Sequence, residues 1–229
     1  MHFLSSHFSM NSEHVCLPNG SPANPFNIPY YNIPPSVPVL AAISSPNKRE
    51  RRWTKLHWGL VPAWKETIEA QKPLINARVE TVLEKPSFRE AIRKRRCLIP
   101  ASGFFEWKKD GRTKTPHLIQ FKTKETFAFA GIWERWMQSK QVHFSCAILT
   151  TEANALLQPI HHRMPIMLQR DHFSKWLDGD ATTESMKEWA VPIANHALEA
   201  YPVSPLVNQT KHNSEECLAP SLHQGHLFE

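Results

Sequence analysis

Glycine is scarce in this chain of 229 residues, with only 7 in all, and this argues against glycine-rich phosphate loops. Neither a P-loop nor a dinucleotide-binding fingerprint occurs, since both need several glycines at fixed spacing. Cysteine is also scarce, at positions 16, 97, 146 and 217, and no two form a C-x-x-C pair, so a zinc ribbon is not expected. Cys97 and Cys146 lie in apolar runs, and we expect them to be small core residues.

Long apolar runs are missing as well. No stretch approaches the ~20 apolar residues that a membrane-spanning helix needs, and Met1-His2-Phe3-Leu4 lacks the basic start and sustained apolar region of a signal peptide. We therefore expect a cytoplasmic protein with reduced thiols and no membrane partner. Hydrophobic residues make up 41% of the chain, which at this length is enough for the packed core of one domain.

The charge balance is only mildly basic. There are 27 lysines and arginines against 21 acidic residues, which gives a formal net charge of +6. This excess permits a polyanionic partner such as a nucleic acid, but it fits a basic protein without such a partner equally well. Charge alone therefore leaves both interpretations open.

Many short apolar runs separated by turn residues predict a strand-rich fold. Strands are expected at 39–44, 56–61, 97–100, 103–108, 117–123, 127–133 and 143–150, with Asp110-Gly111 at a hairpin turn and a charged turn at 47–52. Helices are expected at 86–96, 153–157, 170–177 and 183–189, and the proline-rich stretch 18–38 should be an extended loop.

These elements predict an α+β fold with a mixed or antiparallel, curved, barrel-like sheet and peripheral helices. We expect one domain over residues 1–212, in which residues 1–30 form a divergent N-terminal segment, and a flexible tail over residues 213–229 because that stretch is polar.

Three polar residues stand out among apolar and aromatic neighbours: Asn76, Glu106 and His161. A carboxylate surrounded by aromatic rings is desolvated, which raises its pKa and suits it to general acid or base chemistry. A histidine can serve the same role near neutral pH. Each also has a plain structural interpretation: Glu106 facing solvent on an alternating strand, His161 as a core histidine, and Asn76 as a turn residue.

Eight tryptophans are many for this length, and aromatic rings beside arginine can stack on unpaired bases. Trp64 follows Pro62-Ala63 in an expected loop and is the better candidate for such stacking. Trp133 and Trp189 are expected in the core.

Several segments in a fixed order resemble the SRAP family, the "SOS-response-associated peptidases", over about Tyr31 to Val207. The segments are Tyr31-Asn32-Ile33-Pro34-Pro35, Trp58-Gly59-Leu60-Val61-Pro62, Asn76-Ala77-Arg78-Val79-Glu80-Thr81, Lys85-Pro86-Ser87-Phe88-Arg89, Gly103-Phe104-Phe105-Glu106-Trp107, Gly131-Ile132-Trp133-Glu134-Arg135-Trp136, Leu149-Thr150-Thr151-Glu152-Ala153-Asn154, Ile160-His161-His162-Arg163-Met164-Pro165 and Tyr201-Pro202-Val203-Ser204.

The resemblance implies a protein that captures abasic sites in single-stranded DNA covalently, in the SOS response to DNA damage. In the family, a cysteine exposed by removal of the initiator methionine condenses with the sugar aldehyde to form a thiazolidine. An amine and a thiol on adjacent carbons trap an aldehyde well because ring closure is intramolecular. The resemblance implies no cofactor or metal. We expect a monomer in the bacterial cytoplasm, associated with the nucleoid.

The resemblance also assigns roles to residues of this chain. Asn76 positions the N-terminal residue, Glu106 orients the amine and shuttles protons, and His161 assists opening of the deoxyribose. Arg78 and Arg163 would bind phosphates, and the remaining DNA contacts would come from Pro35, Trp64 and Thr150.

The chain departs from the family at its start, where the family has Met-Cys-Gly-Arg and this chain has His2 in place of the cysteine. Initiator methionine is removed before small residues, so we expect Met1 to stay. Cys16 lacks an adjacent free amine. Three functions remain open: abasic-site chemistry, including a Schiff base on Met1 followed by β-elimination; a single-stranded DNA-binding module without the covalent step; and a protease, for which no motif surrounds Cys16, Glu106 and His161.

Overall fold

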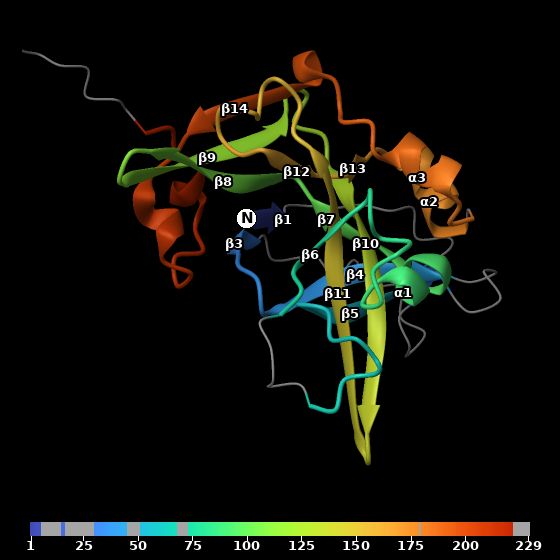
Figure 1. Ribbon diagram of the computed structural model, residues 1–229. Coiled ribbons are helices and arrows are strands. Elements are labelled where there is room, and N and C mark those ends of the chain that lie inside the picture. Colours follow the sequence, from blue (N-terminus) through green and yellow to red (C-terminus); the bar gives the residue numbers. More distant parts are fainter. Residues whose placement is uncertain (6–14, 17–29, 45–50, 68–72, 179, 222–229) are drawn as a thin grey trace, which may run out of the picture.

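The computed structural model describes residues 1–5, 15–16, 30–44, 51–67, 73–178 and 180–221. Strands dominate this part of the chain (Figure 1). The strands are β1 (His2–Ser5), β2 (Val15–Cys16), β3 (Tyr30–Ile33), β4 (Pro38–Ser44), β5 (Arg51–Trp58), β6 (Asn76–Arg78), β7 (Arg96–Ala101), β8 (Gly103–Asp110), β9 (Thr113–Phe121), β10 (Phe127–Gln138), β11 (Gln141–Glu152), β12 (Arg163–Pro165), β13 (Met167–Leu168) and β14 (Leu198–Pro202). The helices are α1 (Arg89–Lys94), α2 (Phe173–Asp178) and α3 (Thr183–Trp189), with 3-10 turns at η2 (Arg170–His172), η3 (Asn195–Ala197), η4 (Pro205–Asn208) and η5 (Glu215–Leu218).

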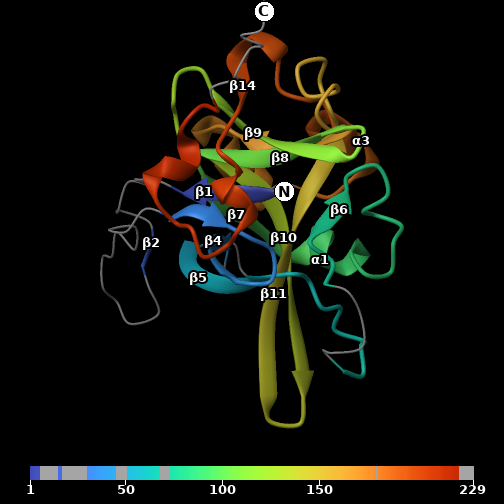
Figure 2. The same ribbon diagram turned by 90° about the vertical axis from the view of Figure 1, so that its left-hand side faces the viewer.

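Strands β4, β5, β11, β10 and β7 close into a ring. Antiparallel pairs join β5 to β4, β4 to β7, β7 to β10 and β10 to β11, and a parallel pair between β11 and β5 completes the circuit. This closed, curved sheet confirms the expected α+β fold with a barrel-like sheet. Both views show the β10–β11 hairpin extending well beyond the rest of the molecule (Figures 1 and 2).

The core lies on both faces of this ring because successive side chains of a strand point to opposite faces. One buried cluster contains Ile99 and Ile148 together with Phe104 of the second sheet. The other contains the neighbouring residues Leu98 and Leu149, together with α2 and α3. The helices therefore cover one face only, at the periphery, as expected (Figure 1).

A second sheet has the order β14-β9-β8-β1-β3 within the described residues. Its first strand, β1, lies between β8 and β3 and is antiparallel to both, with His2 opposite Phe105 and Phe3 opposite Phe104. The N-terminus consequently lies near the middle of the molecule, beside β8, in both views (Figures 1 and 2). This placement makes the first residues part of the site.

Most expected strands are present, but some expected helices differ. Residues 153–157 form a turn rather than a helix. The Asn154 side chain accepts a hydrogen bond from Leu157 N–H (3.1 Å), and Pro159 cannot continue a helix. The helix expected over 86–96 is limited to Arg89–Lys94, and Arg96 already belongs to β7. The helix expected over 170–177 begins as the 3-10 turn η2.

The helix expected over 183–189 is confirmed as α3, and its start has a local cause. The Thr182 side chain accepts from Ser185 N–H (3.1 Å), while the Ser185 hydroxyl accepts from Thr182 N–H (3.0 Å). This reciprocal capping box satisfies two donors that the first turn would otherwise leave free.

The described part of the C-terminal end contacts β3. Cys217 is completely buried, and the Asn213 side chain accepts hydrogen bonds from the N–H groups of Tyr31 and Asn32. These contacts join Asn213 to β3, and the flexible tail expected over residues 213–229 stays a prediction. Residues 222–229 lie outside the described residues.

Candidate functional site

Glu106 lies in the middle of β8, and its side chain is almost buried, with 9% of the residue exposed. The amine of Met1 is 3.9 Å from Glu106 Oε2, within ion-pair distance. The interpretation of Glu106 as a solvent-facing strand residue is therefore wrong. The Met1 side chain is also buried, at 2% exposure, although Met1 as a whole residue is half-buried.

His2 points away from this carboxylate. It is opposite Phe105 on β8, whose side chain lies on the other face of the strand from Glu106. The His2 ring packs edge-on against Trp107, with ring centroids 5.0 Å apart, and His2 Nδ1 is 2.8 Å from Asn32 Oδ1. The residue beside Glu106 is therefore Met1, and His2 belongs to the opposite layer.

Asn32 fixes the hydrogen-bonding state of His2. Its side-chain Nδ2 donates toward the carbonyls of Val207, Gln209 and His212, at 3.2, 3.3 and 3.2 Å. Its Oδ1 is then left to accept from the His2 Nδ1–H group. Burial lowers the pKa of His2, the hydrogen bond to Asn32 opposes this, and the nearby N-terminal charge lowers the pKa further. A neutral His2 ring thus ties β1 and β3 to the C-terminal end.

Asn76 opens β6, a short strand that runs parallel to β11 with Asn76 opposite Ile148. The carbonyl of the preceding residue, Ile75, accepts from the Trp58 indole N–H (2.9 Å) and from Ile148 N–H (3.0 Å). These bonds hold the backbone on both sides, and the Asn76 side chain remains exposed. A fixed backbone with an exposed amide suits a positioning role, as the resemblance implies.

The chain turns directly after β5, and this turn depends on Gly59, the residue that follows the buried Trp58. Gly59 has φ of +148°, and a Cβ at this position would lie 2.6 Å from Pro73 Cβ. Any other residue would therefore clash with Pro73 as well as strain the backbone. Gly59 lets the chain turn back so that Pro73 and Ile75 lead into β6.

His161 lies in the turn that precedes β12, on the other side of β11 from β6. It is half-buried, its ring centroid is 4.6 Å from that of His162, and its Nδ1 is 3.0 Å from the carbonyl oxygen and 3.1 Å from the backbone nitrogen of Arg163. The ring is therefore oriented by the backbone of its own turn.

One apolar cluster connects the three predicted catalytic positions. The cluster contains Phe104 and Met164, and Met1 and Ile75 pack against it. Phe104 is two residues before Glu106, Ile75 precedes Asn76, and Met164 follows the His161 turn. The segments that carry Asn76, Glu106 and His161, from β6, β8 and the turn before β12, thus border the same apolar cluster.

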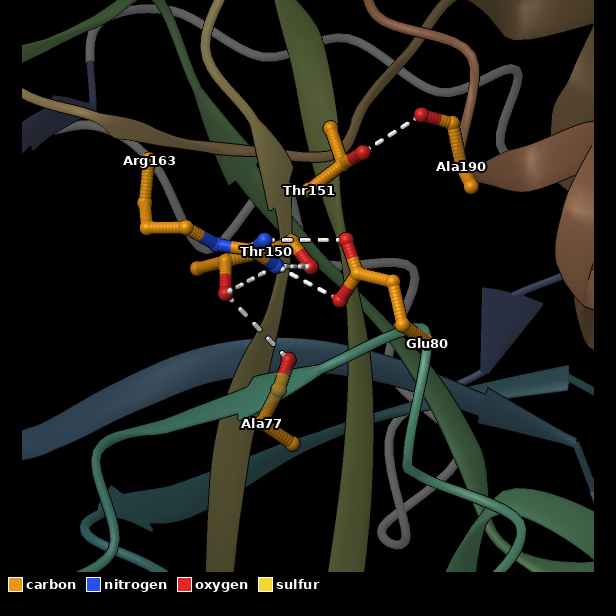
Figure 3. Close-up of polar contacts among 6 residues, drawn as sticks. All are labelled: Ala77, Glu80, Thr150, Thr151, Arg163 and Ala190. Atoms are coloured by element: carbon orange, nitrogen blue, oxygen red, sulfur yellow. Dashed lines mark hydrogen bonds and ion pairs between the residues drawn. The ribbon is translucent and has the colours of Figure 1, made fainter.

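Arg163 makes the most extensive polar contacts of the predicted DNA-binding residues (Figure 3). Its guanidinium donates to both carboxylate oxygens of Glu80, at 2.9 and 2.8 Å, and to the carbonyl of Thr150 at 2.7 Å. The Thr150 hydroxyl is 3.4 Å from the Ala77 carbonyl, to which it donates. Partial burial acts to raise the pKa of Glu80, but the hydrogen bonds and charge of Arg163 outweigh it, so the pKa lies below its ordinary value.

Thr151, next to Thr150, points the other way. Its hydroxyl donates to the carbonyl of Ala190 at the end of α3 (Figure 3). The two adjacent side chains of β11 therefore point to opposite faces of the sheet. Thr150 faces Arg163, and Thr151 faces the helices.

The other predicted DNA contacts differ in exposure. Trp64 is 61% exposed, as a stacking residue must be, and Lys65 Nζ lies 5.3 Å from the centre of its indole ring. Arg78 is exposed on the same side of β6 as Asn76, and Pro35 is half-buried. Trp189 is in the core as expected, while Trp133 is only partly buried against it.

A separate pocket of about 220 Å³ is lined mainly by the segment that follows β5 and contains none of the predicted catalytic residues. His57 and His143 line it, with ring centroids 5.2 Å apart. Burial lowers the pKa of His143, and the adjacent His57 lowers it further.

The described thiols are unsuited to nucleophilic chemistry. Cys97, Cys146 and Cys217 are completely buried, and burial raises the pKa of the Cys97 and Cys146 thiols. The side chain of Cys16 lies outside the described residues. Among the residues that the structure describes, no three His, Cys, Asp or Glu side chains are grouped as a metal would require, and no helix is long and apolar enough to cross a membrane.

Two residues of the site were not singled out from the sequence. Glu80 is one of several exposed acidic residues, and only the fold shows that it pairs with a residue 83 positions later. Asn32 lies in a proline-rich stretch expected to be a loop, although its side chain is 4% exposed. The one indication in the sequence was that this polar residue lies between the apolar side chains of Tyr31 and Ile33.

Comparisons with known proteins agree with one another. A family model described as "SOS response associated peptidase (SRAP)" matches residues 6–210. "Abasic site processing protein YoaM" of Bacillus subtilis (strain 168) is 41% identical over 198 residues, covering 85% of this chain and 86% of that protein. "Abasic site processing protein HMCES" of Rattus norvegicus is 32% identical and covers 84% of this chain and 65% of that protein. An X-ray structure of a Bacteroides thetaiotaomicron protein superposes with a TM-score of 0.74 at 30% identity, covering 82% of each chain.

Proposed function

Because the chain belongs to the SRAP family, we propose that it processes abasic sites in single-stranded DNA through an imine on the amine of Met1. The observation that carries this proposal is the 3.9 Å separation between that amine and the enclosed carboxylate of Glu106. Relatives named abasic site processing proteins support the substrate class.

The first step forms the covalent bond. The Met1 amine attacks C1′ of the ring-opened abasic sugar, and the carbinolamine loses water to give an imine. Glu106 is placed to take a proton from the ammonium and to return one to the departing hydroxyl. Asn76 would hold the sugar end of the strand, since its amide is exposed on a fixed backbone.

The second step breaks the strand. A base removes the proton from C2′ of the imine, the electron pair forms the C2′–C3′ double bond, and the C3′–O bond breaks with the phosphate as leaving group. His161 is the candidate base, because a hydrogen bond from its Nδ1–H to the Arg163 carbonyl (3.0 Å) would leave Nε2 free to accept the proton. Water then hydrolyses the imine and frees the amine.

A stable thiazolidine is not part of this proposal. Neither Met1 nor His2 carries a thiol, and His2 lies on the opposite face of β1 from Glu106. The expected products are an imine that reverses and a cleaved strand. The same proposal includes a monomeric protein that acts on DNA in the bacterial cytoplasm during the DNA damage response.

One observation favours a second function, a single-stranded DNA-binding module without chemistry. The Met1 side chain is 2% exposed and packs against the apolar cluster, so it leaves little open surface at the residue that would have to meet the sugar aldehyde. In that case the exposed Trp64 and Arg78 would still bind a strand.

One gel distinguishes the two functions. The protein, with its N-terminal residue first identified by intact mass, is incubated with single-stranded DNA that carries one abasic site, with and without borohydride. We expect a protein–DNA band in denaturing gels only after borohydride reduction, and strand scission without it. A mobility shift with neither product supports the binding module, and a complete lack of binding overturns both functions.

A further inference from the structure

The Glu80–Arg163 pair occupies a position that the proposed function assigns to DNA. The two terminal guanidinium nitrogens of Arg163, Nη1 and Nη2, donate to Glu80 Oε1 and Oε2, at 2.9 and 2.8 Å. This two-point arrangement is the one that arginine also makes with a phosphate group. A carboxylate and a strand phosphate would therefore compete for the same edge of Arg163.

The competing carboxylate is charged and open to solvent. The pKa of Glu80 lies below its ordinary value, since the hydrogen bonds and charge of Arg163 outweigh the partial burial that would raise it. The Glu80 side chain is 39% exposed, while that of Arg163 is 14% exposed. A DNA strand approaching from solvent would therefore meet the Glu80 carboxylate first. At that point the negative charge of Glu80 neutralises the positive charge of Arg163.

Arg163 keeps its place without Glu80. The Thr150 carbonyl accepts from Arg163 Nη2 at 2.7 Å and also from Val79 N–H at 3.0 Å, so a backbone oxygen fixed in β11 holds the guanidinium. Arg78, by contrast, is exposed and acts on Glu80 through its charge, which helps to lower the pKa of that carboxylate. Of the two arginines, only Arg163 is held in a two-point pair with Glu80.

We propose that Glu80 is an internal competitor of the DNA phosphate for Arg163, and that it limits the affinity for single-stranded DNA and its salt dependence. The inference rests on the proposed single-stranded DNA binding. In the native protein Arg163 stays paired with Glu80. It therefore neutralises no DNA phosphate and releases no counterion from the DNA when the strand binds. Removing the Glu80 charge frees Arg163, which Thr150 still holds, to bind one further phosphate.

The test measures binding of undamaged single-stranded DNA against salt concentration, which keeps chemistry out of the measurement. Each phosphate neutralised adds about 0.7 to the slope of log affinity against log salt for single strands. We expect Glu80→Gln to bind more tightly at low salt and to steepen the slope by about 0.7. Adding Arg163→Met to Glu80→Gln should return the slope to the native value.

Glu84→Gln is the matched control, because Glu84 is an exposed carboxylate on the same turn and is not bonded to Arg163. It should leave the slope unchanged. A native slope in Glu80→Gln, or equal gains in Glu80→Gln and Glu84→Gln, overturns the inference. Thermal unfolding of each variant checks the fold, and Glu80→Ala gives a second measurement of the same slope if Glu80→Gln does not fold. Native protein that does not bind the strand overturns the proposed function instead.

Discussion

The α-amine of Met1 and the carboxylate of Glu106 lie 3.9 Å apart across two neighbouring strands, β1 and β8. Met1 directly precedes β1, so the pairing of β1 with β8 places its amine beside β8, and the Glu106 side chain completes the approach. The Glu106 carboxylate is largely buried, which strengthens the interaction relative to water. The chemistry proposed for the site depends on this pair.

Replacing Glu106 by Gln should slow abasic-site scission and borohydride trapping by at least about tenfold, since general acid–base groups contribute this much or more. Glutamine keeps the size of the side chain but cannot exchange a proton. Binding of undamaged single-stranded DNA should stay within about threefold, because Glu106 does not face the strand phosphates. Unchanged scission at normal binding would remove Glu106 from the mechanism.

His161 and His162 offer a matched pair of neighbouring histidines. His161 is half-buried and its Nδ1 contacts the backbone of Arg163, whereas His162 is exposed. We expect His161→Ala to lower the rate of scission at least about tenfold, consistent with loss of a general base, with trapping less affected because imine formation comes first. His162→Ala should behave like the native protein, and equal losses in both variants would contradict the role given to His161.

Asn32→Ala should destabilise the fold. Asn32 is 4% exposed. Its amide nitrogen donates to the carbonyls of Val207, Gln209 and His212, and its oxygen accepts from His2, so its loss leaves buried groups without partners. We expect a loss of roughly 2–4 kcal/mol in the free energy of unfolding by urea, since each unsatisfied buried group costs about 1–3 kcal/mol.

The control for Asn32 is Asn208→Ala, which removes one exposed hydrogen bond, from the Trp107 indole to Asn208 Oδ1 (2.7 Å). Its cost should be no more than about 1.5 kcal/mol, the usual contribution of a single hydrogen bond. If the two variants unfold at the same urea concentration, Asn32 does not have the linking role that its contacts indicate.

Acid should weaken the fold partly through His2. Its pKa in the folded protein is lowered by burial, which is the largest cause, and also by the N-terminal charge. The hydrogen bond that His2 donates to Asn32 opposes this lowering. Glu106 is the other charged group facing the N-terminal amine. The unfolded chain therefore takes up a proton more readily, and stability is full above the ordinary histidine pKa of about 6.5 and is lost as the pH falls toward the lowered value.

His2→Gln removes this titration, so it should reduce the loss of unfolding free energy between pH 7.5 and pH 5.5 measured by urea titration. Some loss should remain, because burial and His57 also lower the pKa of His143. The exposed His196→Gln is the control and should leave the pH dependence as it is. The same loss in His2→Gln and the native protein would contradict a neutral, buried His2.

The sequence was informative where chemistry follows from local pattern. Alternating apolar runs predicted most strands, and the segments around Asn76, Glu106 and His161 pointed to one family and one site. The helix expected at 153–157 failed because Asn154 caps its own turn, a competition that periodicity does not reveal. The roles of Glu80 and Asn32 depend on partners 83 and more than 170 positions away, which only the folded chain brings together.

The structure also gives a new interpretation of His2, the residue that stands where the family has its cysteine. From the sequence, His2 stood where the family has its cysteine. In the structure His2 packs against Trp107 and Asn32, and Met1 lies beside Glu106. The relevant question is therefore what the amine of Met1 can do, since the His2 imidazole is on the other face of β1.

The most direct measurement is to locate the bond between protein and DNA. The native protein is trapped with borohydride on single-stranded DNA carrying one abasic site, digested, and the modified peptide is identified by mass spectrometry. We predict that the sugar is attached to the α-amine of the peptide that begins with Met1. Attachment to a lysine elsewhere in the chain, or the absence of any trapped peptide, would contradict the proposed chemistry.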